Sequence, residues 1–256
     1  MRHGDFTKLA KYYHNRPGYS LKILELLGEY IKKNTGKEKL VIADVGAGTG
    51  KLTENLIRCG FTGYAIEPND AMRNEGIDFC SHSNAFTWMK GSAEQTGLPD
   101  NSVDWILMGS SFHWTDYQKS LKEFNRILIP KGGFTAIYNP RNISQSSLHS
   151  EIEKSILGIV PELNRISSGL KQNIEEKISD TSYFSDLIFV EGSHVEEMSK
   201  ERYLGIWHSV NDIRVQAGEK RFTEILKMIE RKIWNLETIV VPYKIRSWTV
   251  LSTKTN

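Results

Sequence analysis

The stretch VIADVGAGTGKL, residues 41–52, constrains the fold of this chain more than any other segment. Its first five residues are mostly apolar, which predicts a short strand covered on both faces of a sheet. Gly46, Gly48 and Gly50 follow at alternate positions, and Leu52 and Leu56 then recur at helical spacing. The segment therefore predicts a buried strand, a tight glycine turn and a helix in direct succession.

A glycine turn of this kind suits a bound ligand. Glycine permits backbone angles that a side chain forbids, and it lets a ligand approach the main chain closely. The free amides at the start of a helix favour a negatively charged or strongly polar group. Asp44, near the end of the strand, supplies an acceptor for a ligand ammonium. The alternative is purely steric, because a strand–helix corner can need glycine without any ligand.

A second short strand, YAIE at Tyr64–Glu67, ends in an acid downstream of the turn. An open α/β sheet places a carboxylate there, about twenty residues on, to accept hydrogen bonds from ribose hydroxyls. Two nucleotide-binding layouts share this arrangement. The dehydrogenase fingerprint needs glycine at its sixth position, where this chain has Lys51, so a nicotinamide enzyme is disfavoured.

The Gly-x-Gly-x-Gly spacing after Asp44 resembles motif I of class I S-adenosylmethionine-dependent methyltransferases. The segments GSAEQTGLPDNSVDWILMGSSFHWTD (Gly91–Asp116) and FNRILIPKGGF (Phe124–Phe134) are similar to the methyltransferase type 11 family. YYHNRPGYS (Tyr12–Ser20) and the pair His113–Trp114 resemble the small-molecule subgroup that includes trans-aconitate methyltransferase. These motifs stand in the family's order, so the resemblance bears on fold and cofactor, and it does not identify the methyl acceptor.

The resemblance implies a Rossmann-like α/β fold. We expect a mostly parallel seven-stranded sheet with helices on both faces, an N-terminal lid and a helical cap insertion. A single domain, residues 1–256, would comprise a lid and first helix (1–35), a cofactor-binding core (36–143), a cap with strand six (144–236) and the last strand (237–256). The later strands are expected at 86–89, 104–108, 134–138, 187–195 and 243–252, and the later helices at 117–128, 200–211 and 219–236.

The same resemblance implies the residues that contact S-adenosylmethionine. Asp44 and the glycine turn would hold the methionyl part, Glu67 the ribose, and the segment at residues 92–94 the adenine surroundings. The expected cofactor contacts are Asp44, Gly46, Ala47, Gly48, Gly50, Glu67, Pro68, Ser92, Ala93, Glu94, Gly109 and Ser110. For Glu94 the alternative is that its side chain simply caps the next turn.

The acceptor residues are expected from the lid, from the segment after the fourth strand and from the cap. They are Tyr12, Arg16, Tyr19, Ser111, His113, Trp114, Arg141, Trp207 and His208. His113 is a candidate general base because an unperturbed histidine titrates near neutrality. The alternative is that the His-Trp pair only shapes the pocket, since an acceptor carboxylate is already ionised at neutral pH. The lid tyrosines and the cap residues can equally be packing residues.

Composition sets the class of protein. A chain of 256 residues, with 39% hydrophobic and 25% charged residues, is long enough for one sizeable α/β domain. Cys59 and Cys80 are expected as free thiols in a reducing compartment. We find no signal-length apolar N-terminus and no membrane-length apolar run, which predicts a soluble cytoplasmic protein. No metal-spaced Cys/His cluster is found, and Lys-, Asn- and Ile-rich usage is typical of an AT-rich bacterial source.

The expected activity is methyl transfer to an oxygen or nitrogen of a small metabolite. Arg16 and Arg141 favour an anionic acceptor, such as a carboxylate or a phosphorylated or nucleotide-linked sugar-pathway intermediate. A nucleic-acid methyltransferase is disfavoured by the formal net charge of only +2. A non-catalytic binder of S-adenosylmethionine remains an alternative. Neither a membrane partner nor a nucleic-acid partner is expected, and the sequence carries no signal for the oligomeric state.

Overall fold

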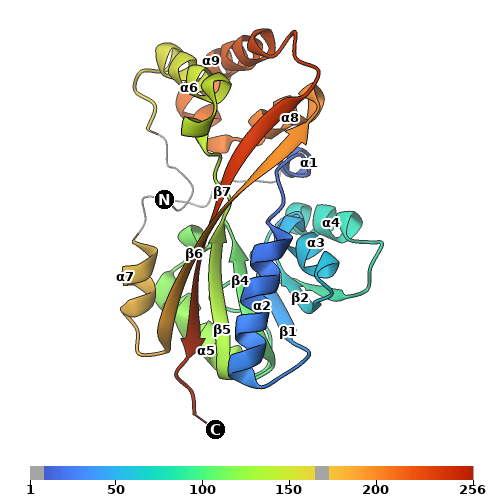
Figure 1. Cartoon of the computed structure of the whole chain (residues 1–256), viewed down its shortest axis with the longest axis vertical. Coiled ribbons are helices and arrows are strands. Elements are labelled where there is room, and N and C mark those ends of the chain that lie inside the picture. Colours follow the sequence, from blue (N-terminus) through green and yellow to red (C-terminus); the bar gives the residue numbers. More distant parts are fainter. Residues whose placement is uncertain (1–8, 165–172, 256) are drawn as a thin grey trace. The chain divides into compact units, whose positions relative to one another are not determined.

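The computed structural model describes residues 9–164 and 173–255, which include one seven-stranded sheet (Figure 1). The seven strands have the order β3-β2-β1-β4-β5-β7-β6. The first five pair in parallel and β7 pairs antiparallel to β5. This arrangement confirms the predicted fold class. The strands are β1 Val41–Val45, β2 Thr62–Ile66, β3 Phe86–Met89, β4 Val103–Gly109, β5 Leu128–Tyr138, β6 Phe184–Met198 and β7 Ile239–Ser252.

The chain divides into two compact units. We call Gly18–Asn139, Ser168–Gly192 and Ile245–Asn256 the core unit, and Met1–Pro17, Pro140–Ser167 and Ser193–Lys244 the cap unit. Helices α2 (Leu21–Thr35), α3 (Lys51–Arg58), α4 (Asp70–Phe79), α5 (Tyr117–Ile127) and α7 (Ile174–Ser179) belong to the core unit. Helices α1 (Ala10–Tyr13), α6 (Ser147–Ile159), α8 (Lys200–His208) and α9 (Asn211–Lys232) belong to the cap unit. Two single 3-10 turns, Phe112–Trp114 and Ile143–Gln145, complete the helical elements of the described residues.

Helices cover both faces of the sheet in the core unit. On one face, Leu24 of α2 and Leu56 of α3 pack in one cluster with Trp105 of β4. On the other, Phe124 of α5 packs in a second cluster with Ile106, the next residue of β4. Neighbouring residues of a strand point to opposite faces, so this split shows β4 buried on both sides. The apolar runs of the parallel strands follow from this double burial.

A chain of hydrogen bonds inside the sheet links β4, β5 and β7. The Trp105 indole Nε1 donates to Thr135 Oγ1 at 2.8 Å. The hydroxyls of Thr135 and Thr249 lie 2.8 Å apart. All three side chains are fully buried, so each polar group needs such a partner. The pair Thr135–Thr249 also fixes the register in which β7 adds to the sheet.

Strand β5 differs from the prediction, which ended a helix at Leu128 and began the strand at residue 134. The strand starts at Leu128 and runs through Pro130 and two glycines. A register shift between Val103 and Trp105 accommodates the extra residues as a bulge. A bulge is a position where a strand tolerates proline, because no ladder hydrogen bond is lost. The same bulge puts backbone close to Gly132, where a Cβ would lie 2.9 Å from the Asp104 carbonyl oxygen.

The cap unit has its own hydrophobic cluster. Ile152 and Ile156 of α6, Trp207 of α8 and Ile225 of α9 are buried together. Helix α9 begins earlier than predicted, but Gly218 inside it has φ 71° and marks a kink. The predicted start at residue 219 therefore coincides with the second half of α9. Within the described residues, no helix combines the length and the apolar character needed to cross a membrane.

Candidate functional site

The glycine turn joins β1 to α3, and its three glycines all have positive φ, at 71°, 58° and 80°. A Cβ at Gly46 would lie 2.8 Å from Ser111 Oγ, and one at Gly50 would lie 2.9 Å from Cys80 Sγ. Steric crowding alone therefore accounts for these two glycines, in agreement with the purely steric alternative given for the turn. Gly48 differs, because a Cβ there would approach only the Met72 methyl, at 3.4 Å. The open side of the turn is thus at Gly48.

Asp44 lies at the start of this turn and is fully buried. Its Oδ2 accepts a hydrogen bond of 2.6 Å from Thr53 Oγ1. Its Oδ1 has no hydrogen-bond partner in the part of the chain that the structure describes. Burial raises the pKa of Asp44 to about 7, and the nearby Glu67 carboxylate adds to this shift. A buried acceptor without a partner is unfavourable, so it is suited to a donor from a ligand.

Glu67 follows β2 and fastens the turn. Its Oε2 accepts the Gly48 amide at 2.9 Å, and its Oε1 accepts the Asn69 amide at 2.9 Å. Burial raises the pKa of Glu67, and these two amides oppose the rise. Each carboxylate oxygen has a second lone pair, so ribose hydroxyls can still donate to it.

Two buried carboxyl groups close enough for Glu67 to raise the pKa of Asp44 favour a ligand with positive charge. S-adenosylmethionine carries an ammonium and a sulfonium, together with two ribose hydroxyls. The orphaned Asp44 oxygen fits the ammonium, and the Glu67 carboxylate fits the hydroxyls. The residues present are therefore compatible with this cofactor.

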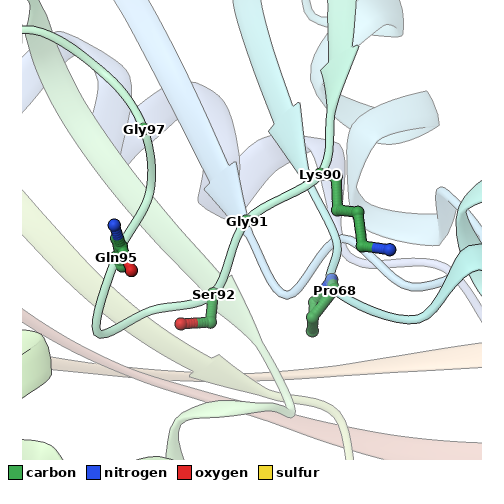
Figure 2. A pocket seen from close by; sticks show the side chains of 6 residues that line it. All are labelled: Pro68, Lys90, Gly91, Ser92, Gln95 and Gly97. Atoms are coloured by element: carbon green, nitrogen blue, oxygen red, sulfur yellow. The ribbon is translucent and has the colours of Figure 1, made fainter.

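A pocket of ≈ 310 Å³ opens at the carboxyl ends of β2 and β3 (Figure 2). The expected cofactor residues Pro68 and Ser92 line it. So do Lys90, Gly91, Gln95 and Gly97, which the cofactor set predicted from sequence did not include. Lys90 directly follows β3, so the rule that open sheets bind ligands beyond the carboxyl ends of their strands would have found it. Ala93, the next expected residue, is buried in the core beside this loop.

The Glu94 side chain has a structural contact. Its Oε1 accepts the amide of Asp116 at 2.9 Å, and Asp116 is the N-cap of α5. The loop after β3 is thereby tied to the start of α5. This contact is with a distant helix start and not with the next turn, and the expected role of Glu94 beside the adenine stays a prediction.

The end of β4 brings three expected residues together with the lid tyrosine Tyr19. A Cβ on Gly109 would lie 2.8 Å from the Tyr19 hydroxyl. That hydroxyl is 3.1 Å from Ser110 Oγ, and Ser110 has φ 55°. A positive φ is unusual for serine and marks a constrained backbone. Ser111 Oγ donates to the Val45 carbonyl oxygen at 3.3 Å, so it braces the turn.

His113 packs between two aromatic rings. Its ring lies 4.7 Å from Trp114 and 5.8 Å from Tyr138, measured between centroids. Its Nδ1 is buried without a hydrogen-bond partner among the described residues. Burial lowers the pKa of His113 to about 4, and the Lys177 ammonium adds to this shift. The ring is therefore neutral at physiological pH, which is the form that can accept a proton.

This depressed pKa gives a direct prediction. The ¹H and ¹³C shifts of the His113 ring should stay constant between pH 5.5 and 8, about one unit or more above its pKa. Comparison with the spectrum of His113→Gln identifies the signal. A midpoint near 6.5 for His113 would contradict the burial that the structure shows.

The remaining expected acceptor residues lie in the cap unit. Tyr12 stacks on His208 with ring centroids 4.9 Å apart. Arg16 donates from its guanidinium to Ser209 Oγ and to the Ser209 carbonyl oxygen, both at 2.9 Å. The Arg141 guanidinium lies 4.0 Å above the Trp207 ring. The structure thus forms the pairs Tyr12–His208 and Arg141–Trp207. Arg16 is held instead by the hydroxyl and the backbone carbonyl of Ser209, at the C-terminal end of α8.

Sequence reasoning missed several polar residues. Thr53, which orients Asp44, has no motif of its own, although its place in the first turns of α3 was a usable signal. His149, Tyr203 and Tyr243 are nearly fully buried in the cap unit, and burial cannot be read from their residue types.

Comparison with known proteins agrees with this geometry. Residues 43–136 match the family model described as a methyltransferase domain. An uncharacterized methyltransferase of Mycobacterium bovis is 35% identical over 101 residues, which is 40% of this chain and 40% of the relative's own length. The first relatives are thus matched over less than half their length. An uncharacterized methyltransferase of Schizosaccharomyces pombe is 27% identical over 241 residues, 88% of this chain and 86% of that protein.

A solved structure shows the same fold. A candidate type II methyltransferase from Anaeromyxobacter dehalogenans aligns with a TM-score of 0.64 at 19% identity, over 91% of this chain and 97% of that one. Residues 43–136 therefore match a methyltransferase domain, and the chain has the class I methyltransferase fold.

Proposed function

We propose that this protein is an S-adenosylmethionine-dependent methyltransferase that methylates an oxygen or nitrogen of a small, anionic acceptor. The observation that carries the cofactor is the buried Asp44 oxygen without a partner at the head of an open glycine turn. The acceptor class is supported by Arg141, which makes no ion pair with any described residue. A formal net charge of +2 gives no support to a nucleic-acid substrate.

When bound, the cofactor would supply a methyl group on a positively charged sulfur, and this sulfur would be the leaving group of an in-line displacement at the methyl carbon. The chain's own residues then have to position the acceptor and exclude water. Asp44 would hold the ammonium, Glu67 the ribose, and the pocket at Pro68 and Ser92 the adenine end. Gly109 and Ser110 would bring backbone close to the sulfur.

His113 is proposed as the residue that takes a proton from an acceptor hydroxyl or ammonium. Its neutral ring can act as a base, although a pKa of about 4 makes it a weak one. A carboxylate acceptor needs no base, because it is already ionised. His113→Gln should therefore reduce turnover strongly only with acceptors that carry a proton on the reacting atom.

The proposal is tested by isothermal titration of the whole chain with S-adenosylmethionine, S-adenosylhomocysteine and NADH. We expect saturable binding of both adenosyl ligands and none of NADH. Methyl transfer is then screened against small carboxylates, phosphorylated amines and nucleotide sugars, with mass-spectrometric detection of the product. Binding of NADH alone, or of none of the three, would overturn the assignment. Adenosyl binding without turnover on any acceptor would favour the non-catalytic binder.

A further inference from the structure

The cap unit contains an unusual concentration of buried polar atoms without well-aligned hydrogen bonds. Tyr243 Oη and His149 Nε2 have no partner among the described residues. Tyr203 Oη and Trp207 Nε1 form no well-aligned hydrogen bond there, although burial raises the pKa of the Tyr203 hydroxyl and the nearby Arg141 and Trp207 side chains oppose that rise. These four side chains are each at most 2% exposed. Native proteins satisfy nearly all buried polar groups, so several orphans in one place need an explanation.

These side chains are gathered around one arginine. The Arg141 guanidinium lies 4.0 Å above the Trp207 ring, and Arg141 forms an isolated antiparallel bridge with Tyr243. The ring of Tyr203 is 5.7 Å from His149 and 6.2 Å from Trp207. Arg141 also affects the pKa of His149, Tyr203 and Tyr243 through its charge. We call Arg141, His149, Tyr203, Trp207 and Tyr243 the Arg141 cluster.

The free hydrogen-bonding capacity of this cluster is mainly donor capacity. The Trp207 indole is only a donor, the tyrosine hydroxyls can donate, and Arg141 presents a fork of N–H groups. Ser146 Oγ accepts the His149 amide and lies 2.6 Å from His149 Nδ1. This arrangement favours a hydroxyl proton directed at Nδ1, which leaves the ring proton on the orphaned Nε2.

The charge of the cluster also favours an anionic ligand. Burial lowers the pKa of His149 to about 4, so its ring is neutral and Arg141 supplies the positive charge. The carboxylate of Glu196, which acts on Tyr243, is bound to Arg202. A guanidinium surrounded by neutral donors in a dry site binds the planar oxygens of a carboxylate or the oxygens of a phosphate.

We propose that the Arg141 cluster is a binding site for an oxyanion, either a carboxylate or a phosphate group. This proposal does not depend on the proposed function. The guanidinium would take two oxygens of the anion, and the hydroxyls of Tyr203 and Tyr243 with the Trp207 indole would donate to the remaining lone pairs.

The test uses the whole chain and two probes, malonate and inorganic phosphate, titrated calorimetrically at constant ionic strength. We expect saturable binding of one probe, and which of them binds separates a carboxylate site from a phosphate site. Arg141→Gln should weaken that binding at least tenfold. Arg214→Gln is the matched control, because Arg214 lies 4.7 Å above the Phe222 ring in the same unit. The control should bind as the wild type does.

Tyr243→Phe distinguishes a binding site from a structural network. Without ligand, removal of a buried hydroxyl that has no partner should leave the melting temperature unchanged or raised. With the probe, the ligand-induced rise in melting temperature should shrink. A lowered melting temperature of the unliganded variant, no probe binding to the wild type, or unaltered binding by Arg141→Gln would each overturn the proposal. Parallel titration with S-adenosylmethionine keeps the proposed function separate, because its affinity should be the same in all these variants.

Discussion

Asp44→Asn should weaken S-adenosylmethionine binding about 100-fold and, at pH 8, make the unliganded protein more stable. The loss of affinity follows because the amide cannot offer a charge to the ligand ammonium, and charge-assisted hydrogen bonds in buried sites are among the strong ones. Titration calorimetry measures it. Asp104→Asn is the matched control: Asp104 is also buried, but it accepts from Lys37 Nζ and from the Val41 amide. That variant should lose stability and keep its affinity.

The stability effect follows from the raised pKa of Asp44, from 3.8 to about 7. A carboxyl group whose pKa is raised by folding binds its proton more tightly in the folded state, so it destabilises the fold as pH rises from about 4 to 7. Above pH 7 the whole penalty is present, on the order of 4 kcal/mol. Asn carries no such penalty. Denaturant unfolding of the wild type and of Asp44→Asn should therefore show a difference in the free energy of unfolding that is larger at pH 8 than at pH 5. An equal difference at both pH values would refute the raised pKa of Asp44 as its cause.

Glu67→Ala should reduce affinity for S-adenosylhomocysteine about 100-fold, and Glu67→Gln about tenfold. The alanine variant leaves the Gly48 and Asn69 amides without their shared acceptor, so the turn itself loosens. The glutamine variant keeps one acceptor oxygen and loses the charge. Calorimetry on both variants measures the ranking, with Asp78→Asn on the exposed side of α4 as the control.

The proposed contact between Glu67 and the ribose hydroxyls can be tested separately by comparing the affinities of two smaller ligands. Adenosine should bind the wild type more tightly than 2′,3′-dideoxyadenosine, because only adenosine can donate to the carboxylate. In Glu67→Gln this preference should shrink, which is the logic of a double-mutant cycle. An undiminished preference would show that the ribose hydroxyls bind elsewhere.

Sequence patterns predicted the strand, the glycine turn and the helix at residues 41–58 for physical reasons. The segment at residues 41–52 combines a buried strand, positive-φ glycines and an amphipathic helix, and each of these leaves a local signal. Asp44 and Glu67 could be named because they stand at strand ends. The hydrogen bond from the Gly48 amide to Glu67 could not be predicted, since it depends on how two adjacent strand ends meet in space.

Two other features were beyond local patterns. The early start of β5 depends on a bulge opposite β4, and proline and glycine in that segment look like a turn when read alone. The Arg141 cluster joins residues that are far apart in the sequence, from the end of β5 to β7. Only Arg141 and Trp207 of its five members were expected. The burial of the histidine and of the two tyrosines could not be predicted from their residue types.

The antiparallel addition of β7 to β5 has a consequence for the rate of folding. The hydrogen-bonded pair Thr135–Thr249 is separated by 114 residues, and most of the described cap unit lies in that interval. Closing a loop costs more entropy as it lengthens, by about 0.6 kcal/mol for each doubling when it is flexible, and such distant contacts slow folding. If the cap unit collapsed early, the loop between β5 and β7 would be effectively shorter and the two strands would pair sooner. Packing defects in the cap should then delay completion of the sheet, so the refolding kinetics of the two units would be linked although their hydrophobic clusters are separate.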